Sequence, residues 1–149
     1  LMMLQQHIEG DLKGKVVYLP DYTVTLAKRM VSGTDVWLNT PVVGFEACGT
    51  SGMKAALNGS LPCSTSDGWV YEINLDEIGW ILESDYVSQS IFDRLEQKIL
   101  PLYYEEKSAW KDRMQKSRDM IQKNFSSTKM LRKYIEVLYK QSIDTHHTS

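Results

Sequence analysis

Residues 35–65, DVWLNTPVVGFEACGTSGMKAALNGSLPCST, contain the pattern that decides the fold. Asp35–Leu38 is a short apolar run, which predicts a buried strand, and a loop with a proline and a glycine follows it. A helix is predicted from about Thr50 to Gly59, where the glycine ends it. Ser60–Thr65 then predicts another short strand, which the turn SDG terminates. Strand, helix and strand therefore follow one another.

The same alternation extends toward the N-terminus. Lys15–Pro20, KVVYLP, is an apolar run between a glycine and a proline, which predicts a further buried parallel strand. Asp21–Val31 has apolar residues spaced by three and four and Gly33 just beyond it, which predicts a helix. Such alternation is typical of a parallel sheet whose ligands gather at the carboxyl ends of its strands. We therefore expect an α/β fold with a Rossmann-like sheet.

From about residue 88 the pattern predicts helices only. Ile91, Leu95 and Ile99 recur every four residues until Pro101, which is expected to break the run. The last helix begins at NFSS, where either serine, Ser126 or Ser127, could cap it. Its wide apolar stripe comprises Met130, Leu131, Tyr134, Ile135, Leu138 and Tyr139.

We expect one truncated domain in two parts. Residues 1–87 form the α/β part, and residues 88–149 form a helical segment that packs on it. The tail from Ser142 is expected to be frayed, and its two histidines are expected to bind no metal.

Composition excludes several classes of function. The 149 residues carry a net charge of −2, so no basic surplus indicates a nucleic-acid partner. No apolar run is long enough for a membrane span, and the start of the chain does not resemble a secretory signal, so a cytoplasmic location is expected. Cys48 and Cys63 lie far apart without paired histidines, which indicates free thiols and no metal site.

The glycine turn before Lys54 favours an anion. Gly49 and Gly52 let the backbone approach a ligand, and the unpaired amides that open the helix point toward it. Thr50 and Ser51 add hydroxyl donors, so a phosphate group fits this turn. The alternative is a turn that only caps a helix, followed by a solvated lysine. Neither a nucleotide P-loop nor a dinucleotide fingerprint fits the spacing.

Glu46 stands just before this turn. A carboxylate that faced the anion would repel it, so Glu46 is expected to hydrogen-bond neutral hydroxyls beside the anion, such as those of a sugar. The alternative is a solvated loop glutamate.

At these residues the sequence resembles the α-glucan phosphorylases, a family that includes glycogen, starch and maltodextrin phosphorylases, and it is most similar to the shorter bacterial branch. The shared motif is EACGTSGMK, residues 46–54. The resemblance continues through AALNG and the DGW turn at 67–69, and it also covers LPDYTVTLAKRMVSGTDVWLNTP upstream and NFSSTKMLRKY downstream. Essentially the whole chain is included.

The resemblance implies a pyridoxal 5′-phosphate cofactor. Lys54 matches the lysine that forms a Schiff base with it, and the amides of Thr50 and Ser51 match groups that bind its phosphate. Tyr22 matches a tyrosine that lies against the cofactor. Asp21 stands where the family usually has asparagine, which adds a negative charge nearby.

The resemblance also implies a glucose-binding subsite. Glu46, Cys48 and Gly49 match positions that bind hydroxyls of the glucosyl unit, although Cys48 replaces the commoner serine and so lacks a strong donor. The expected reaction is phosphorolysis of an α-1,4-glucan by inorganic phosphate, which yields glucose 1-phosphate.

Family members are several times longer and place the active site between two domains of the glycosyltransferase-B type. The resemblance makes this chain the end of the second domain. The family's lysine and arginine motif for inorganic phosphate is missing, since Lys28 and Arg29 do not match it. We therefore expect the chain to be inactive alone.

Two other functions stay open. The chain could be a non-catalytic association module with a vestigial pocket, which would form homo-oligomers through its exposed sheet edge. It could also belong to the nucleotide-sugar glucosyltransferases, such as glycogen and starch synthases, which share the architecture. That family has a second glutamate eight residues after the first, where this chain has Lys54, which argues for pyridoxal phosphate.

Overall fold

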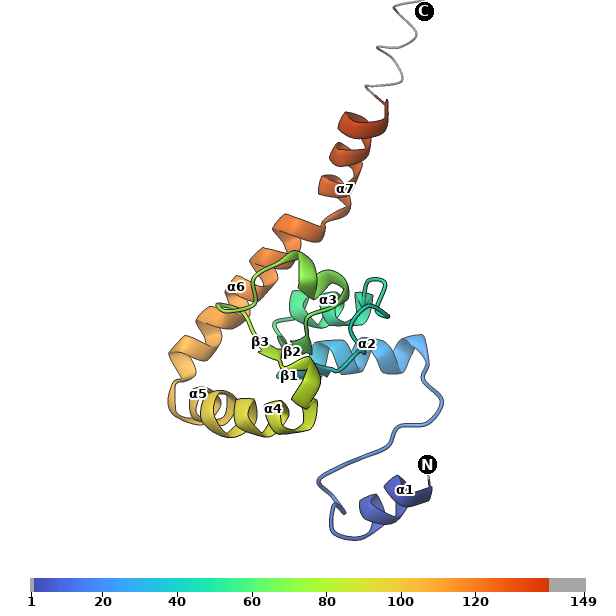
Figure 1. Cartoon of the computed structure of the whole chain (residues 1–149), viewed down its shortest axis with the longest axis vertical. Helices are drawn as coiled ribbons and strands as arrows, with labels where there is room; N and C mark the ends of the chain where they lie inside the picture. Colours follow the sequence, from blue (N-terminus) through green and yellow to red (C-terminus); the bar gives the residue numbers. More distant parts are fainter. Residues whose placement is uncertain (1, 140–149) are drawn as a thin grey trace, which may run out of the picture.

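Three short parallel strands lie at the centre of the fold (Figure 1). The computed structural model describes residues 2–139. The sheet has the order β1-β2-β3, with β1 at Val36–Asn39, β2 at Leu61–Thr65 and β3 at Trp80–Leu82. All five residues of β2 are buried, because β2 is paired on both sides and covered by helices. The predicted Rossmann-like α/β arrangement is thereby confirmed.

Two helices accompany the first strands, as predicted. Helix α2, Val24–Gly33, begins after Thr23, whose hydroxyl accepts a hydrogen bond from the Leu26 amide at 3.2 Å. Helix α3, Thr50–Leu57, connects β1 to β2 and packs against α2. The N-terminal helix α1, Met2–Glu9, precedes them.

The second half is helical. Helix α4 at Val87–Arg94 leads through a π turn at Leu95–Ile99 into α5 at Leu100–Glu105. Helix α6 at Lys107–Phe125 packs along α3 and β2, and α7 at Ser127–Tyr134 projects from its end into a π turn at Ile135–Tyr139 (Figure 1). A 3₁₀ turn at Gly68–Glu72 lies between β2 and β3, and another at Ser84–Tyr86 lies between β3 and α4.

The core consists of two apolar clusters. Helix α6 contributes to both, through Ile121 to the first and Trp110 to the second. The first cluster comprises Ala56, Trp69, Val70, Leu75, Ile78 and Ile121. The second comprises Leu61, Cys63, Trp80, Leu82, Ile99 and Trp110. The long helix therefore joins the helical half to the sheet.

Two details of the predicted secondary structure are wrong, and one strand was not predicted. Residues 15–20 are not a strand. The Val16 amide donates a hydrogen bond to the Leu12 carbonyl in a turn, and Val17 is 71% exposed. The segment that connects α1 to α2 runs away from the sheet (Figure 1). Pro101 does not end the helical run, because it directly follows the π turn, whose wider hydrogen bonding already departs from the α-helical ladder, and it is tolerated in the first turn of α5. Strand β3 was not predicted, because three residues give no periodicity.

Both cysteines are free thiols, as predicted. Cys63 lies in β2, where burial raises the pKa of its thiol to about 11. It therefore stays protonated and acts as a small apolar residue. Cys48 is exposed.

Within residues 2–139, no helix is both long and apolar enough to cross a lipid bilayer. The division at residues 87 and 88 falls at the start of α4 and stays a prediction, as does the cytoplasmic location. The histidines of the tail lie outside the described residues.

Candidate functional site

The turn between β1 and α3 holds the glycine motif. Gly49 has φ +78°, in the left-handed region that favours glycine, and it immediately precedes α3. A Cβ atom at Gly49 would lie 2.7 Å from Oε1 of Glu46. The backbone conformation therefore favours glycine here, and a side chain at this position would displace the Glu46 carboxylate.

Asp67, which follows β2 in the sequence, holds this turn by hydrogen bonds. One carboxylate oxygen, Oδ2, accepts hydrogen bonds from the amides of Gly44 at 3.0 Å, Phe45 at 3.2 Å and Glu46 at 2.9 Å. The other oxygen accepts one from the amide of Gly68 at 2.8 Å. These N–H groups, that of Glu46 foremost, hold the pKa of Asp67 below its ordinary value.

Trp69, two residues after Asp67, also binds the glycine turn. The Trp69 amide donates to the Cys48 carbonyl at 3.0 Å, so the chain beyond β2 runs against the glycine turn. The buried Trp69 ring lies under α3, and a Cβ at Gly52 would come within 3.1 Å of its Nε1 atom. Gly52 therefore allows α3 to pack closely on Trp69.

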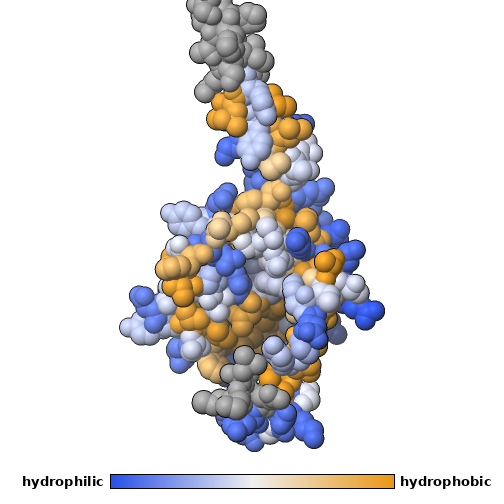
Figure 2. Space-filling model, turned by 90° about the vertical axis from the view of Figure 1, so that its right-hand side faces the viewer, coloured by the Kyte–Doolittle hydropathy of each residue, from blue (hydrophilic) through white to orange (hydrophobic). Residues whose placement is uncertain are grey.

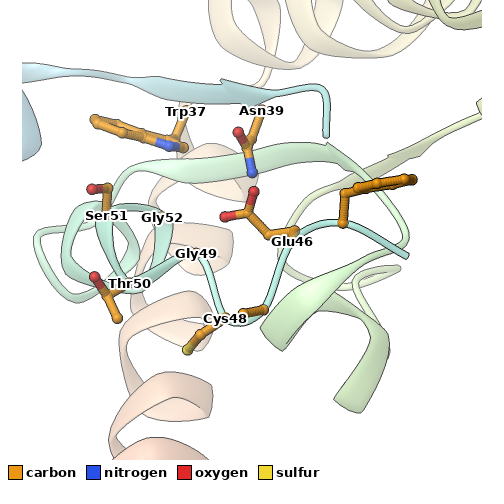
Figure 3. A pocket seen from close by; sticks show the side chains of 10 residues that line it. Trp37, Asn39, Glu46, Cys48, Gly49, Thr50, Ser51 and Gly52 are labelled. Carbon is orange, nitrogen blue, oxygen red and sulfur yellow. The ribbon is translucent and has the colours of Figure 1, made fainter. Parts of the chain in front are cut away.

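A first hollow of about 560 Å³ opens beside the turn (Figure 3). It contains the three residues predicted to bind glucose, Glu46, Cys48 and Gly49, together with Thr50 and Ser51. Figure 3 shows the Glu46 carboxylate pointing toward the side chain of Asn39, at the end of β1. The remaining lining residues are Trp37, Asn39, Phe45, Ala47 and Gly52. The hollow thus lies at the carboxyl end of a parallel strand, as predicted.

A second hollow of about 440 Å³ lies between α2 and α3 and contains Tyr22, Ser51 and Lys54. Ser51 and Lys54 share a face of α3 because they are three residues apart. The other lining residues are Thr23, Val24, Ala27, Lys28 and Val31. Because Ser51 lines both hollows, the predicted cofactor residues and the predicted sugar residues are adjacent.

The backbone at the start of α3 suits a phosphate group. The amides of Thr50 and Ser51 are among the first of the helix, which have no intrahelical acceptor, and no side chain caps this end. The positive end of the helix dipole lies at the same place, and Lys54 is exposed one turn further on. These residues fit the phosphate and the carbonyl group of pyridoxal phosphate.

Asp21 has φ +53°, in the left-handed region. Asparagine and aspartate adopt this region more readily than other non-glycine residues. The backbone therefore explains why aspartate is accommodated at a position where asparagine is usual in the family that the chain resembles.

The family model for carbohydrate phosphorylases matches residues 3–140. The chain belongs to this family. None of the solved structures compared with this phosphorylase chain matches it.

The curated relatives are much longer than the chain. The maltodextrin phosphorylase of Thermococcus litoralis is 36% identical over 144 residues, which cover 89% of this chain and 17% of that protein. The glycogen phosphorylase of Aquifex aeolicus is 39% identical over 147 residues, which cover 89% of this chain and 21% of that protein. The glycogen phosphorylase of Mycobacterium tuberculosis is 33% identical over 145 residues, with coverages of 87% and 17%. This phosphorylase chain therefore spans about a fifth of the length of these relatives.

Sequence reasoning missed three residues at this candidate site. Trp37 and Asn39 line the first hollow, and their position near the end of a predicted strand was the available signal. Asp67 belongs to the DGW turn that carries the resemblance, but its hydrogen bonds span more than twenty residues, which a local pattern does not reveal.

Proposed function

We propose that this chain provides the cofactor-binding and glucose-binding part of a pyridoxal-phosphate-dependent α-glucan phosphorylase. The whole enzyme would cleave α-1,4-glucan with inorganic phosphate and release glucose 1-phosphate. Membership of the phosphorylase family supports this reaction class. The observation that carries the proposal is the adjacency of the two hollows, with Lys54 and Tyr22 in one, Glu46 and Cys48 in the other, and Ser51 in both.

On this proposal Lys54 binds the cofactor covalently, and Tyr22 lies against its ring. The amides of Thr50 and Ser51 hold its phosphate, where the dipole of α3 stabilises the negative charge. Backbone donors of this kind add no positive side chain that would compete for a second phosphate. When bound, the cofactor supplies a phosphate group that exchanges a proton with inorganic phosphate.

The neighbouring hollow would hold the glucosyl unit. The Glu46 carboxylate can accept hydrogen bonds from two sugar hydroxyls, and the exposed Cys48 thiol offers a weak contact. Gly49 lines the same hollow, so its backbone can also face the sugar ring. Inorganic phosphate and the rest of the glucan would need groups from outside this chain, so we propose that the chain alone is inactive.

The test is covalent trapping of the cofactor. The protein is incubated with pyridoxal phosphate, reduced with borohydride and digested, and the labelled peptides are identified by mass spectrometry. We expect the label on Lys54, because it lies on the same short helix as the Thr50 and Ser51 amides and lines the second hollow. Lys54→Ala should abolish the label. Lys111→Ala, a change at an exposed lysine of α6, is the matched control and should label like the wild type.

Labelling spread evenly over surface lysines would contradict the cofactor site. Equal labelling of the wild type and Lys54→Ala would have the same meaning.

A second candidate is the non-catalytic association module. It is favoured by the apolar residues that α7 leaves exposed and by the outer edge of β1, on which no described strand pairs. The mass of the chain in solution tests this candidate, because an association module would form oligomers. The third alternative, a nucleotide-sugar glucosyltransferase, stays disfavoured because Lys54 occupies the position of the expected second glutamate.

A further inference from the structure

We infer that Asp67 is a positioning residue of the sugar subsite, which acts by fixing Glu46. The inference rests on the proposed function, since it concerns how the glucose-binding carboxylate is held. Asp67 itself lines neither of the two hollows. Its effect on a ligand must therefore pass through the turn that it binds.

The hydrogen bonds of Asp67 converge on the backbone before Glu46. Three successive amides, those of Gly44, Phe45 and Glu46, point at the same carboxylate oxygen within 3.2 Å. Such an arrangement fixes the backbone direction from which the Glu46 side chain departs. An asparagine side chain reproduces it only in part, because its single carbonyl oxygen can face the three amides or the Gly68 amide but not both, and its NH₂ group accepts no hydrogen bond.

Two glycines, Gly49 and Gly68, leave the space that the Glu46 side chain occupies. A Cβ at Gly49 would approach its Oε1 to 2.7 Å, and a Cβ at Gly68 would approach its Cγ to 3.0 Å. Gly68 directly follows Asp67 and donates to its second oxygen. The DG pair thus performs two tasks together: the aspartate holds the backbone of Glu46, and the glycine leaves room for its side chain.

Charge is compatible with this role. Four amides surround the Asp67 carboxylate, so its charge is satisfied within the protein, while Glu46 stays directed toward the hollow (Figure 3). Two carboxylates at one turn therefore serve different purposes. One binds backbone, and the other is available to ligand hydroxyls.

The experiment compares Asp67→Asn, Glu46→Gln and the double variant in the whole enzyme of the proposed function, because the chain alone is proposed to be inactive. We measure kcat/KM for a linear α-1,4-glucan, and separately the fraction of Lys54 that borohydride labels with pyridoxal phosphate. Asp67→Asn should lower kcat/KM on the order of ten- to a hundredfold, the cost of a misplaced substrate-binding group. Labelling of Lys54 should be unchanged, and the double variant should lose no more than Glu46→Gln alone.

A structural defect unrelated to Glu46 would give different results. The losses of the two single variants would multiply in the double variant, or Lys54 labelling would fall with kcat/KM, and either outcome overturns the inference. Wild-type kcat/KM in Asp67→Asn would overturn it as well. Asp76→Asn, the same chemical change at an exposed aspartate, is the control and should match the wild type.

If the wild type itself shows no phosphorolysis, the proposed function fails. A second measurement then tests whether Asp67 fixes the backbone before Glu46. Hydrogen exchange of the Gly44, Phe45 and Glu46 amides is followed in the wild type and in Asp67→Asn. Exchange at least tenfold faster in the variant supports the positioning role. Equal exchange rates overturn it.

Discussion

Asp67 makes the stability of the protein depend on pH in a definite direction. Because the four amides lower its pKa in the folded state, the ionised carboxylate stabilises the fold above the unfolded-state pKa of about 3.9. This stability is lost as the pH falls through the folded-state pKa. Urea unfolding at a series of pH values should show Asp67→Asn less stable than the wild type at pH 7, with the difference narrowing below pH ~4. If the difference in stability stayed constant down to pH ~2, or if it were absent at pH 7, the ionised Asp67 carboxylate would not be what holds this turn.

The positions of some candidate residues could be predicted from the local sequence, while their chemical roles stay predictions. Lys54, Ser51 and Gly49 follow from the order of residues at a helix start, and the structure places them on the first turns of α3 or next to it. Asn39 and Asp67 were not predictable in this way. Their roles depend on a strand end and a distant turn meeting at one place, and that meeting arises from the parallel pairing of β1 with β2.

At the level of single elements, Ser126 rather than Ser127 caps α7. Its hydroxyl accepts a hydrogen bond from the Lys129 amide at 3.3 Å. Ser126→Ala should therefore destabilise α7 by about 1 kcal/mol, while Ser127→Ala, at the first helical position, should have little effect. Because α7 buries no residue, hydrogen exchange of its amides should report the change, with the melting temperature nearly constant. Equal exchange in the two variants would exclude the cap.

The elements with strong local signals were predicted, and those that depend on partners were not. Helix α2 has the Thr23 cap, both α2 and α3 have apolar spacing and a glycine near the end, and their observed bounds lie within three residues of those predicted. The run at 15–20 has the composition of a strand, but a strand also needs a neighbour, and its first amide is used in a turn with Leu12. Strand β3 shows the opposite case, since pairing with β2 defines it despite its three residues.

At the level of the whole molecule, the exposed apolar surface is the main feature to explain. Leu131 and Ile135 are 54% and 44% exposed and lie one turn apart on the helix that projects from the body (Figures 1 and 2). Figure 2 shows hydrophobic residues on this projection next to hydrophilic ones. An apolar stripe of this kind marks an interaction surface, and a short helix without packing is marginal in water. The helix therefore gains stability when another surface covers the stripe.

We predict that the 149-residue chain self-associates through this stripe. Sedimentation equilibrium should show a weight-average mass that rises with concentration, because pairing two stripes removes apolar area from water. Leu131→Lys combined with Ile135→Lys should return the chain to a monomer. Gln122→Lys combined with Thr128→Lys adds the same charge at exposed polar positions and should leave association unchanged. If both double variants associate like the wild type, the contact lies elsewhere, and the open edge of β1 becomes the surface to test because its backbone groups have no described strand partner.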